Sequence, residues 1–188
     1  MIRLAHILAI LAIASGCDAR ATLPAAKETT MSLSLHFHTC NLSDDTREAT
    51  NPFTNEKTFF HVDDGLSESE RKAVVDLLRT ASASEPDPDG YYYVDLPDGA
   101  RVGVGASTLS GSDKCVAFAV ECNNLTDAAA DFLFRLSRAG NMSVGSSVNP
   151  DVVAFTAQPN DKVVVRWPKA PLLPDSASLA AWLTANCN

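Results

Sequence analysis

Polar and apolar residues alternate over residues 31–38, where Leu33, Leu35 and Phe37 share one side of the chain and serine and histidine residues share the other. A period of two predicts a β-strand with one buried face and one exposed face. Short runs of β-branched and aromatic residues between turn residues predict further strands. The seven predicted strands cover residues 31–38, 57–62, 91–96, 101–108, 114–122, 152–156 and 162–167.

A helical period replaces this alternation after residue 66. The run Ser67-Glu68-Ser69-Glu70 fits a capping box, in which the Ser67 hydroxyl and the Glu70 carboxylate close the first turn of a helix. Apolar residues then recur every three to four positions, which predicts an amphipathic helix over residues 68–81.

Two further helices are predicted nearer the C-terminus. One covers residues 126–140, and Gly140 is a suitable residue to end it in the left-handed conformation. The other covers residues 176–186 and begins at Asp175 or Ser176, both of which are good N-cap residues.

The order of these elements, β-β-α-β-β-β-α-β-β-α, predicts an α+β fold, with a mainly antiparallel sheet of about seven strands and three helices packed on it. Turns such as Pro97-Asp98-Gly99 favour hairpins between neighbouring strands. Residues 40–56 are polar and rich in turn residues, so we expect no regular element there. The chain is long enough for one globular domain with its own core, over residues 31–188.

The N-terminus has a different pattern. Arg3 precedes an apolar run at 4–14, which is shorter than the roughly 20 residues that span a bilayer and is typical of an export signal. The run Ala14-Ser15-Gly16-Cys17 resembles the lipobox of bacterial lipoproteins, although Ala14 stands where leucine is preferred. The resemblance covers these residues alone and does not assign the body of the chain to a family.

This resemblance implies that residues 1–16 are a signal peptide and that Cys17 receives a diacylglyceryl group. The protein would then be anchored to a bacterial membrane, facing the periplasm or the outside. The alternative is an ordinary secretory signal, with Cys17 a spare thiol. Residues 17–30 are polar and small with one proline, which predicts a flexible lipidated tether.

Charge narrows the choice of partners. Removing residues 1–16 takes away one basic residue, Arg3, and no acid, so the mature chain has 14 basic and 23 acidic residues and a net charge of −9. Nucleic acids and anionic lipid surfaces select basic faces. We therefore expect no nucleic-acid partner, and a protein partner that is itself basic.

Four cysteines remain in the mature chain, and an even number in an exported protein predicts disulfides. Cys115 and Cys122 lie on one predicted strand, about 20 Å apart if it is extended, so they should not pair with each other. Each must then bond with Cys40 or Cys187. Of the two arrangements we favour Cys40–Cys115 and Cys122–Cys187, and the alternative to both is that some thiols stay reduced.

The histidines are the strongest candidates for chemistry. His36, His38 and Cys40 should lie on one face of the first strand, and His61 follows on the next strand. A His-x-His pair on a strand can hold zinc, because alternate side chains project the same way. However, serines continue the same face, which is typical of an ordinary solvated surface. We therefore expect no metal and no cofactor, and Asp63-Asp64 beside His61 is ordinary turn chemistry.

Motifs of known catalytic sites are incomplete. Residues 103–107, Gly-Val-Gly-Ala-Ser, lack the final glycine of a Gly-x-Ser-x-Gly nucleophile elbow. The same glycines lie inside a predicted strand and not at a strand-to-helix turn, so they are not a phosphate-binding loop. They indicate a bend or a close backbone contact.

A surface that binds another protein is better supported by the sequence than a catalytic site. Tyr91, Tyr92 and Tyr93 follow the acidic loop 84–90, and alternation should bury Tyr92. Exposed aromatic residues beside charged groups are typical anchors of protein interfaces. The candidate partner-binding residues, which include Trp167 further along the chain, are Glu85, Asp87, Asp89, Tyr91, Tyr93 and Trp167.

Together these patterns favour a non-enzymatic envelope lipoprotein that binds another protein. A concrete version is an inhibitor or immunity protein that blocks an exported toxin or hydrolase. The alternatives are a metal-dependent envelope hydrolase that uses His36, His38 and His61, and a structural lipoprotein of envelope assembly.

Overall fold

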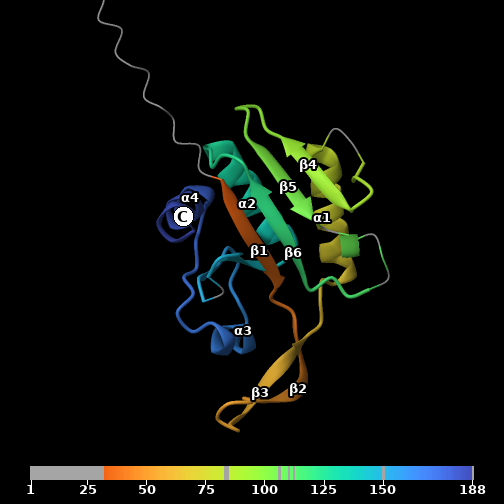
Figure 1. Cartoon of the computed structure of the whole chain (residues 1–188). Helices are drawn as coiled ribbons and strands as arrows, with labels where there is room; N and C mark the ends of the chain where they lie inside the picture. The colour runs from red at the N-terminus through yellow and green to blue at the C-terminus, as the bar shows by residue number, and fades with distance from the viewer. Residues whose placement is uncertain are drawn as a thin grey trace, which may run out of the picture.

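The computed structural model describes residues 32–82, 85–105, 107–109, 111, 113–149 and 151–187. Its centre is a six-stranded antiparallel sheet with the order β4-β5-β6-β1-β7-β8, and a two-stranded sheet, β2-β3, projects from one end of it (Figure 1). The strands are β1 (Leu33–Thr39), β2 (Leu42–Thr50), β3 (Lys57–Asp63), β4 (Tyr91–Asp95), β5 (Arg101–Gly105), β6 (Ala117–Cys122), β7 (Met142–Ser146) and β8 (Val153–Phe155). The fold is α+β with a mainly antiparallel sheet, as the sequence predicts.

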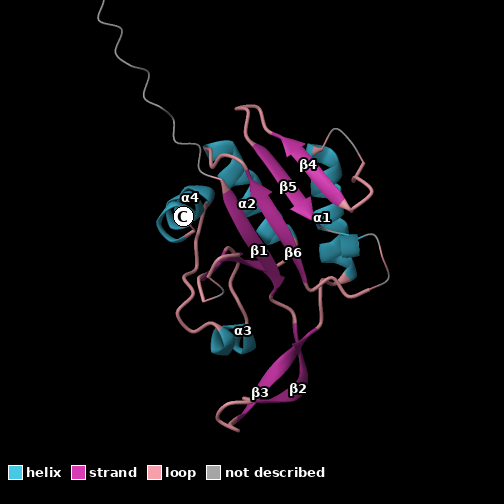
Figure 2. Cartoon of the chain, viewed as in Figure 1, coloured by secondary structure: helices cyan, strands magenta, loops and turns pink. Residues whose placement is uncertain are grey.

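Three helices, α1 (Glu68–Ala81), α2 (Asp127–Ala139) and α4 (Ser176–Asn186), pack on one face of the large sheet (Figure 2). The inward residues of β1, which are Leu33, Leu35 and Phe37, are at most 1% exposed against these helices. Burying each such side chain contributes roughly 1.5–3 kcal/mol. Two short helical segments, η1 (Ser107–Leu109) and α3 (Asp161–Arg166), complete the described elements.

The capping box predicted for α1 is formed. The Ser67 hydroxyl accepts from the Glu70 amide at 3.3 Å, and the Glu70 carboxylate accepts from the Ser67 amide at 2.8 Å. The N-cap of α4 is Asp175, whose carboxylate accepts from the Ser178 amide at 2.7 Å. None of the helices in the described ranges is both long and apolar enough to cross a membrane.

Two predicted segments differ in the structure. Residues 42–50 form a strand, β2, although no element is expected there, because pairing with β3 satisfies the backbone of a segment that is exposed from Asp44 onward. Residues 162–167 form no strand despite three consecutive valines. The Asn160 side chain caps the Val163 amide at 3.0 Å and starts α3 instead, and Val163 is the one buried valine of the three.

Strand β7 is absent from the predicted set, because its sequence, Met-Ser-Val-Gly-Ser, lacks a clear period. All five residues are buried, and the strand pairs with β1 on one side and β8 on the other. The predicted left-handed cap at Gly140 is also wrong, since Gly140 has a φ of −96°. The positive φ of 47° falls on the next residue, Asn141.

Candidate functional site

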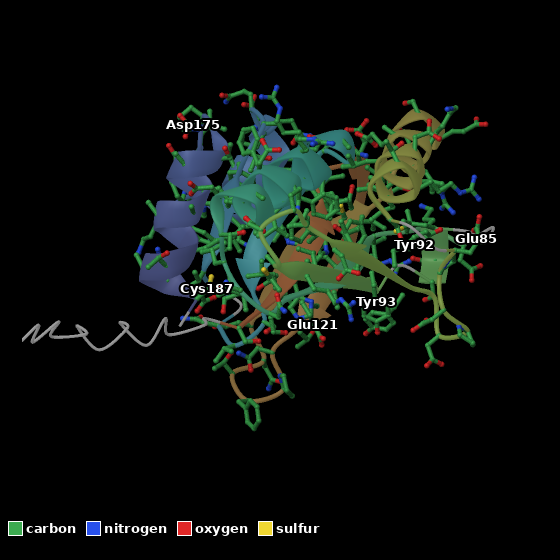
Figure 3. All side chains as sticks on the ribbon, turned by 90° about the horizontal axis from the view of Figure 1, so that it is seen from above. Glu85, Tyr92, Tyr93, Glu121, Asp175 and Cys187 are labelled. Carbon is green, nitrogen blue, oxygen red and sulfur yellow. The ribbon has the colours of Figure 1, made fainter. Side chains whose placement is uncertain are left out.

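The face of the large sheet opposite α1, α2 and α4 carries the surface residues that the sequence singles out. Strand register places one row of residues straight across this open face: Tyr91, Gly105, Ala119, His36, Gly145 and Val153. Figure 3 shows the helices on one side of the sheet with Tyr92, and Tyr93 and Glu121 on the other. The floor of the face is therefore made mostly of small residues, with His36 in the middle and larger side chains at both ends.

At the β4 end, Tyr91 and Tyr93 form a stacked pair with ring centroids 6.1 Å apart. Their rings lie over glycines of the neighbouring strand: a Cβ at Gly105 would be 2.8 Å from Tyr91 Cζ, and a Cβ at Gly103 would be 3.3 Å from Tyr93 Cε1. The predicted close contact at these glycines is thus with aromatic rings and not with backbone. The intervening Tyr92 is 4% exposed, which confirms the predicted alternation.

Charged groups lie beside this pair, and Glu121 and Arg101 line one small hollow with Tyr93. Glu121 lies on β6 opposite Gly103, and Glu85 and Asp89 are exposed in the loop before β4. Among the described residues, none of these three side chains has an ion-pair partner. We call Tyr91, Tyr93 and Glu121, with the loop residues Glu85 and Asp89, the tyrosine patch.

Asp87 differs from the other predicted acidic contacts. Its carboxylate accepts from the backbone amides of Asp89 at 3.0 Å and Tyr91 at 2.8 Å, so it holds the loop in place. Glu121 was missed by sequence reasoning, because its importance depends on the register between β5 and β6. Only its alternation with the buried Val120 and Cys122 could have indicated that it is exposed on this face.

Trp167 lies at the opposite end of the open face, away from the tyrosine patch. Its ring makes edge contacts with His38 and Phe155, at centroid distances of 5.8 and 6.2 Å, and the Arg166 guanidinium covers it at 4.6 Å. Arg166 also donates to Asp63 at 2.8 Å, and His38 Nε2 is 3.7 Å from the other oxygen of that carboxylate.

The predicted histidine cluster is only partly assembled. His36 and His38 share the open face, but the neighbours of β1 are β6 and β7, so His61 is not on the next strand of the sheet. It belongs to the separate β2–β3 sheet, where its ring nitrogen contacts the Ser43 carbonyl at 3.0 Å. Across the described part of the chain, no group of three or more histidine, cysteine, aspartate or glutamate residues is placed to hold a metal ion.

Asp63 and Asp64 point to different partners, as expected of adjacent residues. Asp63 is paired with Arg166 and His38, whereas Asp64 lies 3.4 Å from the Lys114 ammonium. The two carboxylates therefore do not form an acid–base pair with His61.

The cysteine prediction differs from the structure, in which Cys40, Cys115, Cys122 and Cys187 are free thiols. Cys40 packs in a small cluster with Val163 and Phe155, while Cys115 packs in the main core under the helices, so the favoured Cys40–Cys115 bond is not formed. Cys122 donates instead to the Asn124 carbonyl at 3.0 Å, and Cys187 lies on the end of α4.

Burial governs the chemistry of these thiols. It raises the pKa of Cys40 from 9.0 to about 11, and it also raises the pKa of Cys122 and of Cys187. A raised pKa disfavours the thiolate, the reactive form of cysteine. Cys17, the expected lipid attachment site, lies outside the described residues.

No protein-family model, no curated protein and no solved structure matches this chain.

Proposed function

We propose that this protein is a lipid-anchored, protein-binding module of a bacterial envelope, and that the tyrosine patch is its contact surface for a basic exported toxin or hydrolase. The observation that carries the proposal is the stacked Tyr91–Tyr93 pair on a sheet face that the helices leave uncovered. Lipid anchoring rests on the Ala14–Cys17 resemblance to a lipobox.

The pair is suited to binding because its rings are already ordered. Tyrosines are frequent among the residues that dominate interface energies, and rigid side chains lose little entropy on binding. The Gly103 and Gly105 floor lets both rings lie against the sheet, and Tyr93 is nevertheless 44% exposed. The patch thus combines apolar area with fixed geometry.

Charge favours a basic partner. Glu85, Asp89 and Glu121 have no ion-pair partner among the described residues, and the whole chain has a net charge of −8. Exposed carboxylates around an apolar contact steer a basic protein during encounter and disfavour acidic ones. Small acidic inhibitors of basic exported enzymes need these properties and no catalytic group.

The test is chemical cross-linking in the envelope of the source bacterium, followed by affinity purification of the tagged full-length protein. We expect one basic protein to be retained by the wild type and lost with the Tyr91→Ala/Tyr93→Ala double variant. Removing a dominant tyrosine costs about 2 kcal/mol or more, or roughly 30-fold in affinity. The exposed substitution Val165→Ala, on α3, is the matched control and should retain the partner.

Salt supplies a second measurement, since a steered association weakens when charges are screened. With the purified partner, association should slow markedly between 50 and 500 mM salt, and Glu121→Gln should reduce that dependence. Retention of the same proteins by the wild type and the double variant would disprove the proposed contact surface. Recovery of the protein outside membranes both with and without Cys17→Ser would disprove the anchor alone.

A further inference from the structure

A second site lies at the other end of the open face. Two depressions of about 420 Å³ each meet at the segment after α3, and both are lined by Val153, Arg166 and Trp167. One extends over β1 and β7, and the other extends toward α4, where it reaches Trp182. We call the two together the tryptophan groove. It contains both tryptophans of the chain.

The depression over β1 and β7 is lined by serine hydroxyls, two histidine rings and the Arg166 guanidinium. Ser143 Oγ donates to the His38 carbonyl at 3.2 Å, and Ser147 Oγ donates to the Ser34 carbonyl at 2.7 Å. Both hydroxyl protons are therefore already used. Ser143 is 2% exposed, so of these two serines it is Ser147 whose oxygen lone pairs remain for a ligand. The Arg166 guanidinium has five N–H donors, and Nη1 alone is engaged by Asp63.

The depression that extends toward α4 also contains both hydrogen-bond donors and acceptors. Asn186 donates through Nδ2 to the Trp182 carbonyl at 2.8 Å, which leaves its side-chain oxygen as an acceptor. The Asp151 carboxylate and the Lys169 ammonium have no ion-pair partner among the described residues. Donors and acceptors therefore both line the groove, and Asp151 and Lys169 carry opposite charges.

We propose that the tryptophan groove binds a neutral oligosaccharide. Each sugar hydroxyl both donates and accepts, so an oligosaccharide can satisfy a mixture of donors and acceptors, and the apolar C–H faces of its rings pack on indoles. Ligand sites commonly combine aromatic walls with a few such polar groups, and the volume is in the usual range. An anionic ligand would meet Asp151, and a cationic one would meet Arg166 and Lys169.

A peptide added to the sheet edge fits this end of the molecule less well. Strand addition requires free backbone groups on the edge strand. The outer edge of β8 is already occupied, because the Phe155 amide donates to the Pro171 carbonyl at 2.9 Å and the Phe155 carbonyl accepts from Leu173 at 2.7 Å. Side chains, and not strand edges, supply the contacts in the groove.

The test uses the fluorescence of the full-length protein, since both tryptophans line the groove. Titration with tetra-N-acetylchitotetraose and with maltotetraose should give a saturable change in emission with at least one of them. The matching monosaccharide should bind at least tenfold more weakly, because it cannot extend across both depressions. Asp151→Asn should weaken the tetrasaccharide about tenfold.

Asp89→Asn is the matched control, because it changes an exposed carboxylate of the tyrosine patch that has no ion-pair partner in the described ranges, and it should leave sugar binding unchanged. Trp167→Phe keeps the packing with Phe155 and should abolish most of the emission change. No response to either tetrasaccharide up to 10 mM, or a response only to decapeptides of glutamate or lysine, would overturn the proposal. The inference does not rest on the tyrosine patch, so the two can fail separately.

Discussion

The two ends of the open sheet face are built differently. The tyrosine patch at the β4 end is a product of neighbouring strands: two rings from β4 lie on two glycines of β5, in direct register. The tryptophan groove is built by segments that return from far along the chain, since Trp167 and Trp182 meet His38 and Val153 only in the folded protein. Ordered, exposed aromatic rings suit another protein, and a concave groove suits a small flexible ligand.

Both the tyrosine patch and the tryptophan groove can bind ligands only if the open face of the sheet is exposed to solvent and is not packed against another layer. Phe37 and His36 are adjacent on β1 but point to opposite faces, so alanine substitutions at the two positions compare the two faces of the same strand. Phe37 is fully buried and stacks on Phe118 at 5.6 Å. Phe37→Ala should lower the free energy of unfolding by about 3–5 kcal/mol.

His36→Ala should change that free energy by less than about 0.5 kcal/mol, as expected of an exposed residue. Urea unfolding followed by circular dichroism measures both variants. Similar losses for the two would mean that the open face is packed against something in solution.

Cys40, which packs beneath α3 at the groove end of the sheet, should have a medium-sized effect on how the free energy of unfolding depends on pH. Its pKa rises from 9.0 in the unfolded chain to about 11 in the folded protein because burial disfavours the thiolate. The neutral thiol therefore stabilises the fold fully below pH 9, and this contribution is lost as the pH rises through 11. Linkage gives a loss of roughly 2–3 kcal/mol.

Unfolding under reducing conditions at pH 8 and pH 11 measures this loss. In Cys40→Ala the decrease in stability between the two pH values should be smaller than in the wild type by that amount. An equal decrease in both proteins would show that the thiol is not buried.

A small change in stability is also expected at the tyrosine patch. A Cβ at Gly105 would lie 2.8 Å from the far end of the Tyr91 ring, so Gly105→Ala should displace the ring and not the backbone. Stability should fall by less than about 1 kcal/mol. The near-ultraviolet circular dichroism of the tyrosines should nevertheless change, and partner binding should weaken.

Gly111→Ala is the control for this variant, because the nearest neighbour of an added Cβ there is 3.8 Å away. Its spectrum should match that of the wild type. If Gly105→Ala also matches, the rings are not held by the strand beneath them.

Local patterns could predict much of the fold. The alternation in β1 and the capping box of α1 depend on residues close in sequence, so both were predictable. The valines at 163–165 show where such reasoning fails. Their β-propensity is outweighed by the Asn160 cap and by burial of Val163 in the small cluster with Cys40.

The residues of the candidate sites also differ in whether neighbours in the sequence were enough to predict them. Tyr91 and Tyr93 could be predicted as exposed aromatic residues, because alternation within one strand buries Tyr92 between them. Glu121 and the partners of Trp167 could not be predicted, since they depend on which strands pair. The state of the cysteines also depends on tertiary packing: the structure has them as free thiols, and Cys40 and Cys115 belong to separate clusters.

The sequence by itself determined the helix and strand periods, the acidic charge and the choice of which tyrosine is buried, because each depends on neighbours within a few residues. Only the tertiary structure decided that β1 lies between β6 and β7, that His61 is separated from His36 and His38, and that both tryptophans line one groove. Those contacts join segments separated by many residues, and their free energy comes from burial and strand pairing across the whole sheet, which no local pattern encodes.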